Sequence, residues 1–242
     1  MPITRDNALC IRHLDYSETS QVLVFFAHAG GHLRLLAKGA KRPKSKAGGA
    51  IDLFDAGELA YIPSGADQLG TLTEWRQSHY FPHLRQDLSV QHAALYLAEA
   101  TARLTEPYDP HEGLFQAWML VLEALKSAEN WRQVLAWGQY RLLHEIGLAP
   151  RLESCAQCQR GIGAPDHLYF SAASGGVVCR DCEMTLVDKR RLPLAIYEQL
   201  GRLAESRLPN IDLTNAPAIN KYLDYYLTYH LSRPLRLAAY TI

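Results

Sequence analysis

The chain has no net charge to attract a partner, because its 25 Lys and Arg balance 25 Asp and Glu. Any site for nucleic acid or a membrane surface must therefore come from a local excess of one sign. An apolar run near ~18 residues, the length that crosses a membrane, is absent, and so is an apolar leader after Met1. We expect a cytoplasmic protein with reduced thiols and no membrane partner.

Internal repeats, low-complexity tracts and long linkers are missing as well. The chain of 242 residues is longer than a typical domain, and its hydrophobic share of 48% is sufficient for a normal core. We therefore expect several parts that form one compact body.

Four of the five cysteines stand in two Cys-x-x-Cys pairs, Cys155/Cys158 and Cys179/Cys182, with twenty residues between them. Two such loops can close a tetrahedron of thiolates around Zn²⁺. Two disulfides or four unrelated thiols are the alternatives, and the lack of a secretory leader favours zinc. Four thiolates leave no open coordination position, so one structural Zn²⁺ per chain is predicted. The fifth, Cys10, is expected to be a buried small apolar residue.

A zinc hydrolase or deaminase would need an open metal position and a glutamate base, as in an H-x-E motif with P-C-x-x-C. The sequence contains no H-x-E, and Cys155 follows Ser154 instead of proline. A zinc hydrolase or deaminase is therefore not expected.

The first eighty residues favour strands, because short β-branched and aromatic runs are separated by glycine and proline. A turn is expected at Gly30-Gly31, followed by a hairpin strand with one apolar face. Its other face is expected to be wet and basic and to carry His32, Arg34 and Lys38. Five such strands predict a small OB-type barrel. The runs are 8–14, 21–27, 32–38, 58–62 and 71–75.

Charge is uneven within this segment. Residues 31–50 hold six basic residues and no acid, whereas residues 51–74 hold five acids and no base. A mobile basic loop beside a barrel suits a phosphate backbone, although a merely solvated loop is the plain alternative. The predicted DNA-binding residues are Arg34, Lys38, Lys41, Arg42, Lys44 and Lys46.

Helical spacing dominates the rest of the chain outside the cysteine segment. Helices are expected over 89–104, from Pro110 to about Ser127 behind a capping box at Asp109, and over 131–145. Two more follow at 193–204 and 217–231, the last with an apolar stripe that returns it to the bundle. The predicted class is α+β: an OB barrel (1–82), a helical bundle (83–150), an inserted zinc ribbon (151–187) and C-terminal helices (188–242).

The helix at 131–145 combines large aromatic rings with arginines. Most such rings belong to a core, but this group could also form a groove for a partner. The candidate partner-binding residues are Arg132, Trp137, Tyr140 and Arg141.

The chain resembles the RecO family of bacterial recombination mediators. The resemblance rests on Asp15-Tyr-Ser-Glu-Thr-Ser20, Leu35-Leu-Ala-Lys-Gly-Ala-Lys41, Arg141-Leu-Leu-His-Glu-Ile-Gly147 before Pro150, and Leu168-Tyr-Phe-Ser leading to Gly175-Gly-Val-Val-Cys-x-x-Cys182. It implies an OB-fold, a helical bundle and a zinc knuckle, and a protein associated with the nucleoid.

The resemblance also implies function. Members bind single- and double-stranded DNA, anneal complementary strands, dock on the acidic tail of single-stranded-DNA-binding protein, and act with RecR to load RecA. They are not enzymes, so the resemblance implies that this chain is not one either. Such a tail ends in Phe and a carboxylate, which Arg132 and Arg141 could bind beside Trp137 or Tyr140. A zinc-stabilised protein-interaction module without intrinsic DNA affinity is the rival hypothesis.

Overall fold

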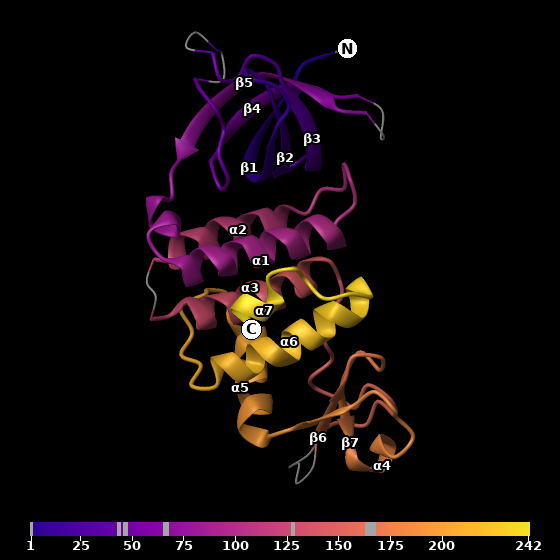
Figure 1. Cartoon of the computed structure of the whole chain (residues 1–242). Helices are drawn as coiled ribbons and strands as arrows, with labels where there is room; N and C mark the ends of the chain where they lie inside the picture. The colour runs from indigo at the N-terminus through magenta and orange to yellow at the C-terminus, as the bar shows by residue number, and fades with distance from the viewer. Residues whose placement is uncertain (1, 43–44, 46–47, 65–67, 127–128, 163–167) are drawn as a thin grey trace. The chain divides into compact units, whose positions relative to one another are not determined.

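The computed structural model describes residues 2–42, 45, 48–64, 68–126, 129–162 and 168–242 (Figure 1). Two compact units share the chain. Unit 1 comprises residues 1–86 and 101–119, and unit 2 comprises residues 87–100 and 120–242. In the part of the chain that is described, no helix is long and apolar enough to span a membrane.

Unit 1 contains a closed five-stranded barrel (Figure 1). Its order is β1-β2-β3-β5-β4, and every pairing is antiparallel except that between β3 and β5, which is parallel. This is the arrangement of an OB-type barrel, so the predicted fold class is confirmed. The strands are β1 (Thr4–Asp15), β2 (Gln21–Ala27), β3 (Gly31–Ala37), β4 (Ala56–Ile62) and β5 (Gly70–His79).

Side chains of β3 alternate as the sequence predicts. Leu33, Leu35 and Ala37 are buried in the barrel core, whereas Arg34 is exposed on the other face. Cys10 is also fully buried in this core, as expected, and burial raises the pKa of its thiol.

The expectation that His32 lies on a wet face is wrong. His32 is 9% exposed, because the segment that joins the first two helices lies along the start of β3. The backbone amide of Tyr108 donates to the carbonyl of His32 at 3.2 Å. Gly31 permits this approach: it has a φ of +63°, and a Cβ there would lie 2.0 Å from the carbonyl oxygen of Asp109.

The same segment explains a second difference. Helix α2 (Glu112–Ala124) begins two residues later than expected, and the Asp109 carboxylate lies 3.2 Å from His111 Nε2. Tyr108, with a φ of 63°, packs against the barrel core and keeps the chain non-helical at this point. The capping box at Asp109 therefore does not form as predicted.

Helices α1 (Leu88–Leu104) and α2 each contribute to both units. Within unit 1, Trp118 Nε1 donates to Thr101 Oγ1 at 3.1 Å, and the Trp118 ring stacks on Phe54 with centroids 6.2 Å apart. A short 3₁₀ helix, η1 (Pro82–Arg85), follows the barrel.

Unit 2 contains the predicted bundle helices. Helix α3 (Trp131–Glu145) has the expected bounds. The chain leaves the helix through Gly147, whose φ is +76°. It packs against α5 (Leu194–Glu205) and α6 (Ala216–Leu231), and a short α7 (Ala238–Thr241) follows. The α6 stripe is buried at Ile219, Leu223, Tyr226 and Leu227.

A buried polar chain ties three helices of unit 2 together. Tyr96 of α1 donates to Asp224 Oδ1 of α6 at 2.7 Å, and Gln139 of α3 donates to the Tyr96 hydroxyl at 3.0 Å. Tyr96 and Gln139 are buried and Asp224 is half-buried, so these hydrogen bonds restrict how the helices can pack.

The cysteine-bearing part of unit 2 is a small ribbon. Its strands β6 (Leu168–Ser171) and β7 (Gly176–Cys179) form the predicted hairpin, and β8 (Arg190–Leu192), which was not predicted, pairs on the other side of β6. Helix α4 (Arg180–Glu183) follows β7. The four-part division of the chain stays a prediction.

The ribbon packs on α6 through Phe170, which is fully buried. Its ring meets those of Tyr222, Tyr225 and Tyr226 at centroid distances of 5.8, 6.3 and 5.6 Å. Edge-to-face rings at such distances are favourable contacts, so α6 carries the ribbon as well as the bundle.

Candidate metal centre and basic barrel surface

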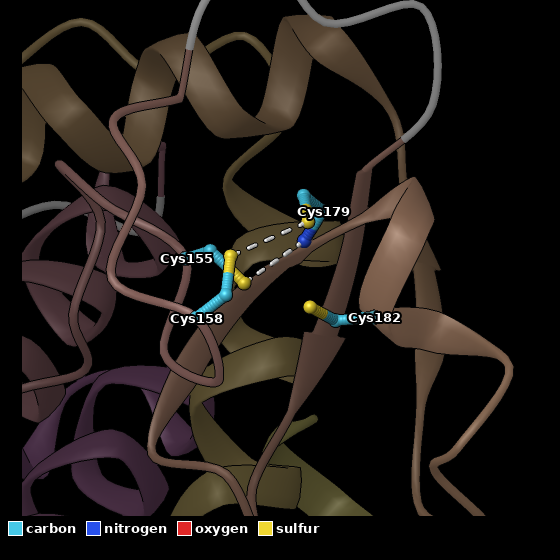
Figure 2. Close-up of side chains that lie close together, drawn as sticks. All are labelled: Cys155, Cys158, Cys179 and Cys182. Carbon is cyan, nitrogen blue, oxygen red and sulfur yellow. Dashed lines mark hydrogen bonds between the residues drawn. The ribbon is translucent and has the colours of Figure 1, made fainter.

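The four cysteines of the two Cys-x-x-Cys pairs meet at one point of the ribbon. Their Sγ atoms all lie within 4.8 Å of one another (Figure 2). Cys158 Sγ and Cys179 Sγ are 3.9 Å apart. Thiolates at ~2.3 Å from a tetrahedral zinc ion stand about 3.8 Å from each other, so this spacing fits such an ion. All five cysteines are free thiols, against the disulfide alternative.

The first pair lies in a tight knuckle. The amide of Cys155 donates to the carbonyl of Arg160 at 2.8 Å, and the amide of Gln159 donates to the carbonyl of Cys155 at 2.8 Å. Gln159 has a φ of 63°, a left-handed conformation that reverses the chain just after Cys158. This backbone turn directs both sulfurs to the same side.

The second pair comes from the hairpin. Cys179 ends β7 and Cys182 lies on α4, so the strand and the first helical turn supply one ligand each. The amide of Cys179 donates to Cys155 Sγ at 3.4 Å, which joins the two pairs (Figure 2). The guanidinium of Arg160 also meets the carboxylate of Asp181 at 3.1 Å, between the two loops.

Gly176 holds the loop before the knuckle against β7. Its φ is +149°, and a Cβ there would lie 2.3 Å from the carbonyl oxygen of Arg151. The amide of Arg151 donates to the carbonyl of Gly175 at 2.9 Å, and the amide of Val177 donates to the carbonyl of Arg151 at 2.9 Å. Only a glycine accommodates this contact, and the contact fixes the position of the loop that leads to Cys155.

The electrostatics of the four thiols suit a cation. The backbone amide and side chain of Arg160 lower the pKa of Cys158 to about 6. Burial alone would raise the pKa of Cys155, but amides donating to its sulfur bring it below the ordinary value. Desolvation and the neighbouring sulfurs raise the pKa of Cys182 to about 12. The donor set therefore favours some thiolates, while complete deprotonation needs a positive charge at its centre.

The basic residues of the barrel are only partly available. Arg34, Lys38 and Arg42 are exposed at the end of β3 and in the loop after it. Lys41 instead pairs with Asp15, with Nζ and Oδ1 2.6 Å apart, and this contact lowers the pKa of Asp15. Lys44 and Lys46 lie outside the described residues.

The Asp15–Ser20 turn holds the start of the basic loop. Ser20 Oγ accepts from the amide of Gly39 at 3.1 Å, and the amide of Lys41 donates to the carbonyl of Thr19 at 3.1 Å. These bonds satisfy backbone amides at the start of the loop, whereas the pairing of Asp15 with Lys41 was not predicted from the sequence. The acidic Asp15 at the start of this motif was the sequence signal that could have predicted an ion pair with the basic loop.

The candidate partner-binding residues share α3 but differ in exposure. Trp137 and Tyr140 are 1% and 6% exposed, and Trp137 Nε1 donates to the carbonyl of Ser206 at 3.2 Å. This burial favours the core alternative for both rings. Arg132 is exposed with its guanidinium 4.3 Å from the Trp131 ring centroid, and Arg141 lies 5.5 Å from that of Trp137. Their role in binding stays a prediction.

Comparison with known proteins identifies relatives for both units. The chain matches the family described as "Recombination protein O N terminal" over residues 1–81 and that described as "Recombination protein O C terminal" over residues 85–238. Among curated proteins, "DNA repair protein RecO" of Pelotomaculum thermopropionicum is 28% identical over 245 residues, covering 99% of this chain and 94% of the relative.

Two further relatives carry the same name. That of Moorella thermoacetica is 29% identical over 240 residues, covering 96% of this chain and 88% of the relative. That of Desulfitobacterium hafniense is 33% identical over 185 residues, covering 76% of this chain and 66% of the relative.

Proposed function

The chain belongs to the RecO family of DNA repair and recombination proteins, and we propose that it binds single- and double-stranded DNA and anneals complementary strands. The observation that carries this proposal is the exposed basic group at the end of β3, on a barrel of OB type. Strands β2 and β3 form the usual ligand face of that barrel class, and Arg34 projects from it.

Among the described residues of β3 and the loop after it, three exposed side chains supply positive charge: Arg34, Lys38 and Arg42. Lys41 contributes less to phosphate binding, because its ammonium is already neutralised by Asp15. Contacts of this kind neutralise phosphates and release counterions, and they do not distinguish bases. Binding is therefore expected to be insensitive to sequence and strongly dependent on salt.

The test is a triple substitution, Arg34→Glu, Lys38→Glu and Arg42→Glu, with binding of labelled single strands measured across a salt series. The slope of log K against log salt should flatten by roughly 0.7 for each lost phosphate contact. Lys41→Glu should have a smaller effect than any of the three. An unchanged slope in the triple variant would show that the loop is only solvated, whereas the protein-interaction rival predicts no salt-dependent DNA binding by the parent chain.

We further propose that Cys155, Cys158, Cys179 and Cys182 hold one structural Zn²⁺. The ion would supply no reaction chemistry, since four sulfurs complete its shell. The chain's own residues form the knuckle, bring the ribbon strands together and place Phe170 against α6. That the chain acts without catalysis is proposed from the family resemblance alone.

The partners proposed from family resemblance are RecR, the acidic tail of single-stranded-DNA-binding protein and, indirectly, RecA. The tail is assigned to α3 through Arg132 and Arg141. A double Arg132→Ala/Arg141→Ala variant that remains folded should bind a tail peptide more weakly than the parent chain. Normal peptide affinity in that variant would remove the assignment without affecting the DNA proposal.

A further inference from the structure

The edge strand β8 of the ribbon carries a basic and aromatic surface that the metal centre does not use. In the sheet order β7-β6-β8, β8 pairs only with β6. Its residues Arg190 and Arg191 are both exposed and point to opposite faces of the strand. Among the described residues, neither arginine takes part in an ion pair.

Arg190 is held in place by an aromatic ring. Its guanidinium lies 3.9 Å from the ring centroid of Tyr225 on α6. That ring is itself fixed, because the Tyr225 hydroxyl donates to Asp188 and accepts from the amide of Ala172 at 3.2 Å. An arginine stacked in this way keeps its N–H groups available and loses little freedom when it binds an anion.

Arg191 lies on the other face of β8, next to Tyr169. The two residues are direct partners in the β6–β8 register, and Tyr169 is partly exposed. Lys189 Nζ lies 5.6 Å from the same ring centroid, although it also pairs with Glu183. A partly exposed ring beside an arginine without an ion pair is an arrangement on which a base can stack while its phosphate is neutralised.

The nearby carboxylates are occupied within the protein. Asp188 accepts from Tyr225 and from the amide of Ala173 at 3.0 Å, and Asp224 accepts from Tyr96 at 2.7 Å. Arg190 and Arg191 are thus exposed, whereas both carboxylates are half-buried and hydrogen-bonded within the protein. This charge distribution is complementary to a polyanion.

A peptide strand fits the edge less well. The carbonyl of Arg191 already accepts from the Tyr222 hydroxyl, so part of the hydrogen-bonding edge of this three-residue strand is used. Addition of a strand depends on such free main-chain groups. The observations favour a ligand recognised by phosphate and ring stacking.

We propose that the β8 edge, with Arg190, Arg191 and Tyr169, is a second contact for single-stranded DNA, separate from the barrel surface. The inference rests on the proposed DNA-binding function and deepens it: annealing brings two strands together, and two separate contacts on one chain allow one strand to be held at each.

The experiment compares variants of the whole, metal-loaded chain with the parent chain. Arg190→Glu/Arg191→Glu removes the charge of the β8 edge. The barrel triple variant described above removes the charge of the barrel surface. Arg202→Glu/Arg207→Glu is the matched control, since both residues are exposed in unit 2 and the net charge changes equally. The probes are a labelled oligothymidine over a salt series and a pair of complementary strands for annealing.

The β8 variant is expected to flatten the salt slope by roughly 1.4, which is two contacts at roughly 0.7 each, and to slow annealing several-fold. Tyr169→Ala should weaken oligothymidine binding without changing that slope, because stacking is not ionic. Arg190→Lys and Arg191→Lys should restore most of the slope, which separates charge from folding.

A slope and annealing rate equal to those of the Arg202/Arg207 control would overturn the inference. So would loss of binding to an oligoglutamate peptide with oligothymidine binding intact, because the surface would then serve an acidic protein. If the parent chain binds no DNA, the proposed function fails. If only the barrel variant loses binding, the function stands and this inference alone is wrong.

Discussion

The barrel and the ribbon are both small β structures, but they are stabilised in opposite ways. The barrel has five strands of seven to twelve residues that close on themselves and surround large buried side chains such as Phe25 and Leu35. The ribbon has strands of four, four and three residues and a free edge at β8. Closure removes edges and encloses a core, whereas so short an open sheet cannot bury enough apolar surface by itself.

The ribbon compensates with two external supports. One is the cluster of four cysteines, and the other is the contact of Phe170 with three tyrosines of α6. The comparison teaches that the barrel should respond to changes in its own core, whereas the ribbon should respond to its ligands and its docking site.

The largest expected effect is loss of a metal ligand. Cys155→Ser should release the ion and destabilise the ribbon by more than about 4 kcal/mol, the range in which loss of a metal falls. Hydrogen exchange should accelerate in β6 and β7 and remain slow in β1–β5. A chelator should reproduce this pattern in the parent chain. Less than about half an equivalent of zinc in carefully purified parent protein would contradict the metal assignment.

A core truncation should show the reverse pattern. Phe25 is fully buried and its ring centroid lies 5.2 Å from that of Trp75. Phe25→Ala should cost about 3–5 kcal/mol of unfolding free energy, because it leaves a cavity in a closed core. Metal content and exchange in the ribbon should not change. If zinc were lost together with the barrel, the two regions would not be independently supported.

A smaller effect is expected at the glycine that holds the loop against β7. Gly176→Ala should destabilise the ribbon by about 1–3 kcal/mol, because its Cβ would meet the Arg151 carbonyl at 2.3 Å. Gly201→Ala is the control: a Cβ at this position of α5 meets nothing within 4 Å. That helical substitution should stabilise the chain by up to about 1 kcal/mol. Equal thermal shifts in both variants would rule out the proposed steric cause.

The smallest effect concerns pH and the barrel unit. Burial, and then the charge of Arg34, lower the pKa of His32, while the Thr105 carbonyl and Glu106 oppose the shift. The unfolded chain therefore binds this proton more readily. The contribution of neutral His32 to the free energy of unfolding is complete above about pH 6.5. It is lost as pH falls through the pKa of the folded state, at no more than about 1.4 kcal/mol per pH unit.

Urea unfolding followed by exchange in β2 and β3 at about pH 7 and about pH 5 would measure this dependence. His32→Gln, which cannot titrate, should reduce it. A pH dependence that is identical in the variant would assign the effect to other groups.

Local sequence signals were sufficient for much of the structure. The runs at 21–27 and 131–145 have the expected bounds, and the hairpin between the cysteine pairs forms as predicted. Each depends on patterning within a short window, which the chain carries in any context. The same holds for the two Cys-x-x-Cys loops.

Contacts between residues far apart in the chain could not be predicted from the sequence. His32 is buried by a segment more than seventy positions away, and Lys41 is paired by Asp15 from the preceding hairpin. The rings of Trp137 and Tyr140 look alike in sequence whether they line a groove or fill a core. Strand β8 is too short to have a periodic pattern of its own.

The sequence by itself determined the class of each part: a five-stranded barrel, a helical bundle and a four-cysteine knuckle. These follow from periodicity, turn residues and ligand spacing, which are local properties. Only the tertiary structure decided which charges are exposed and which are neutralised, because exposure and pairing depend on residues brought together from remote parts of the chain. Arg34 and Arg190 are thereby exposed, whereas Lys41 and Asp224 are already engaged within the protein.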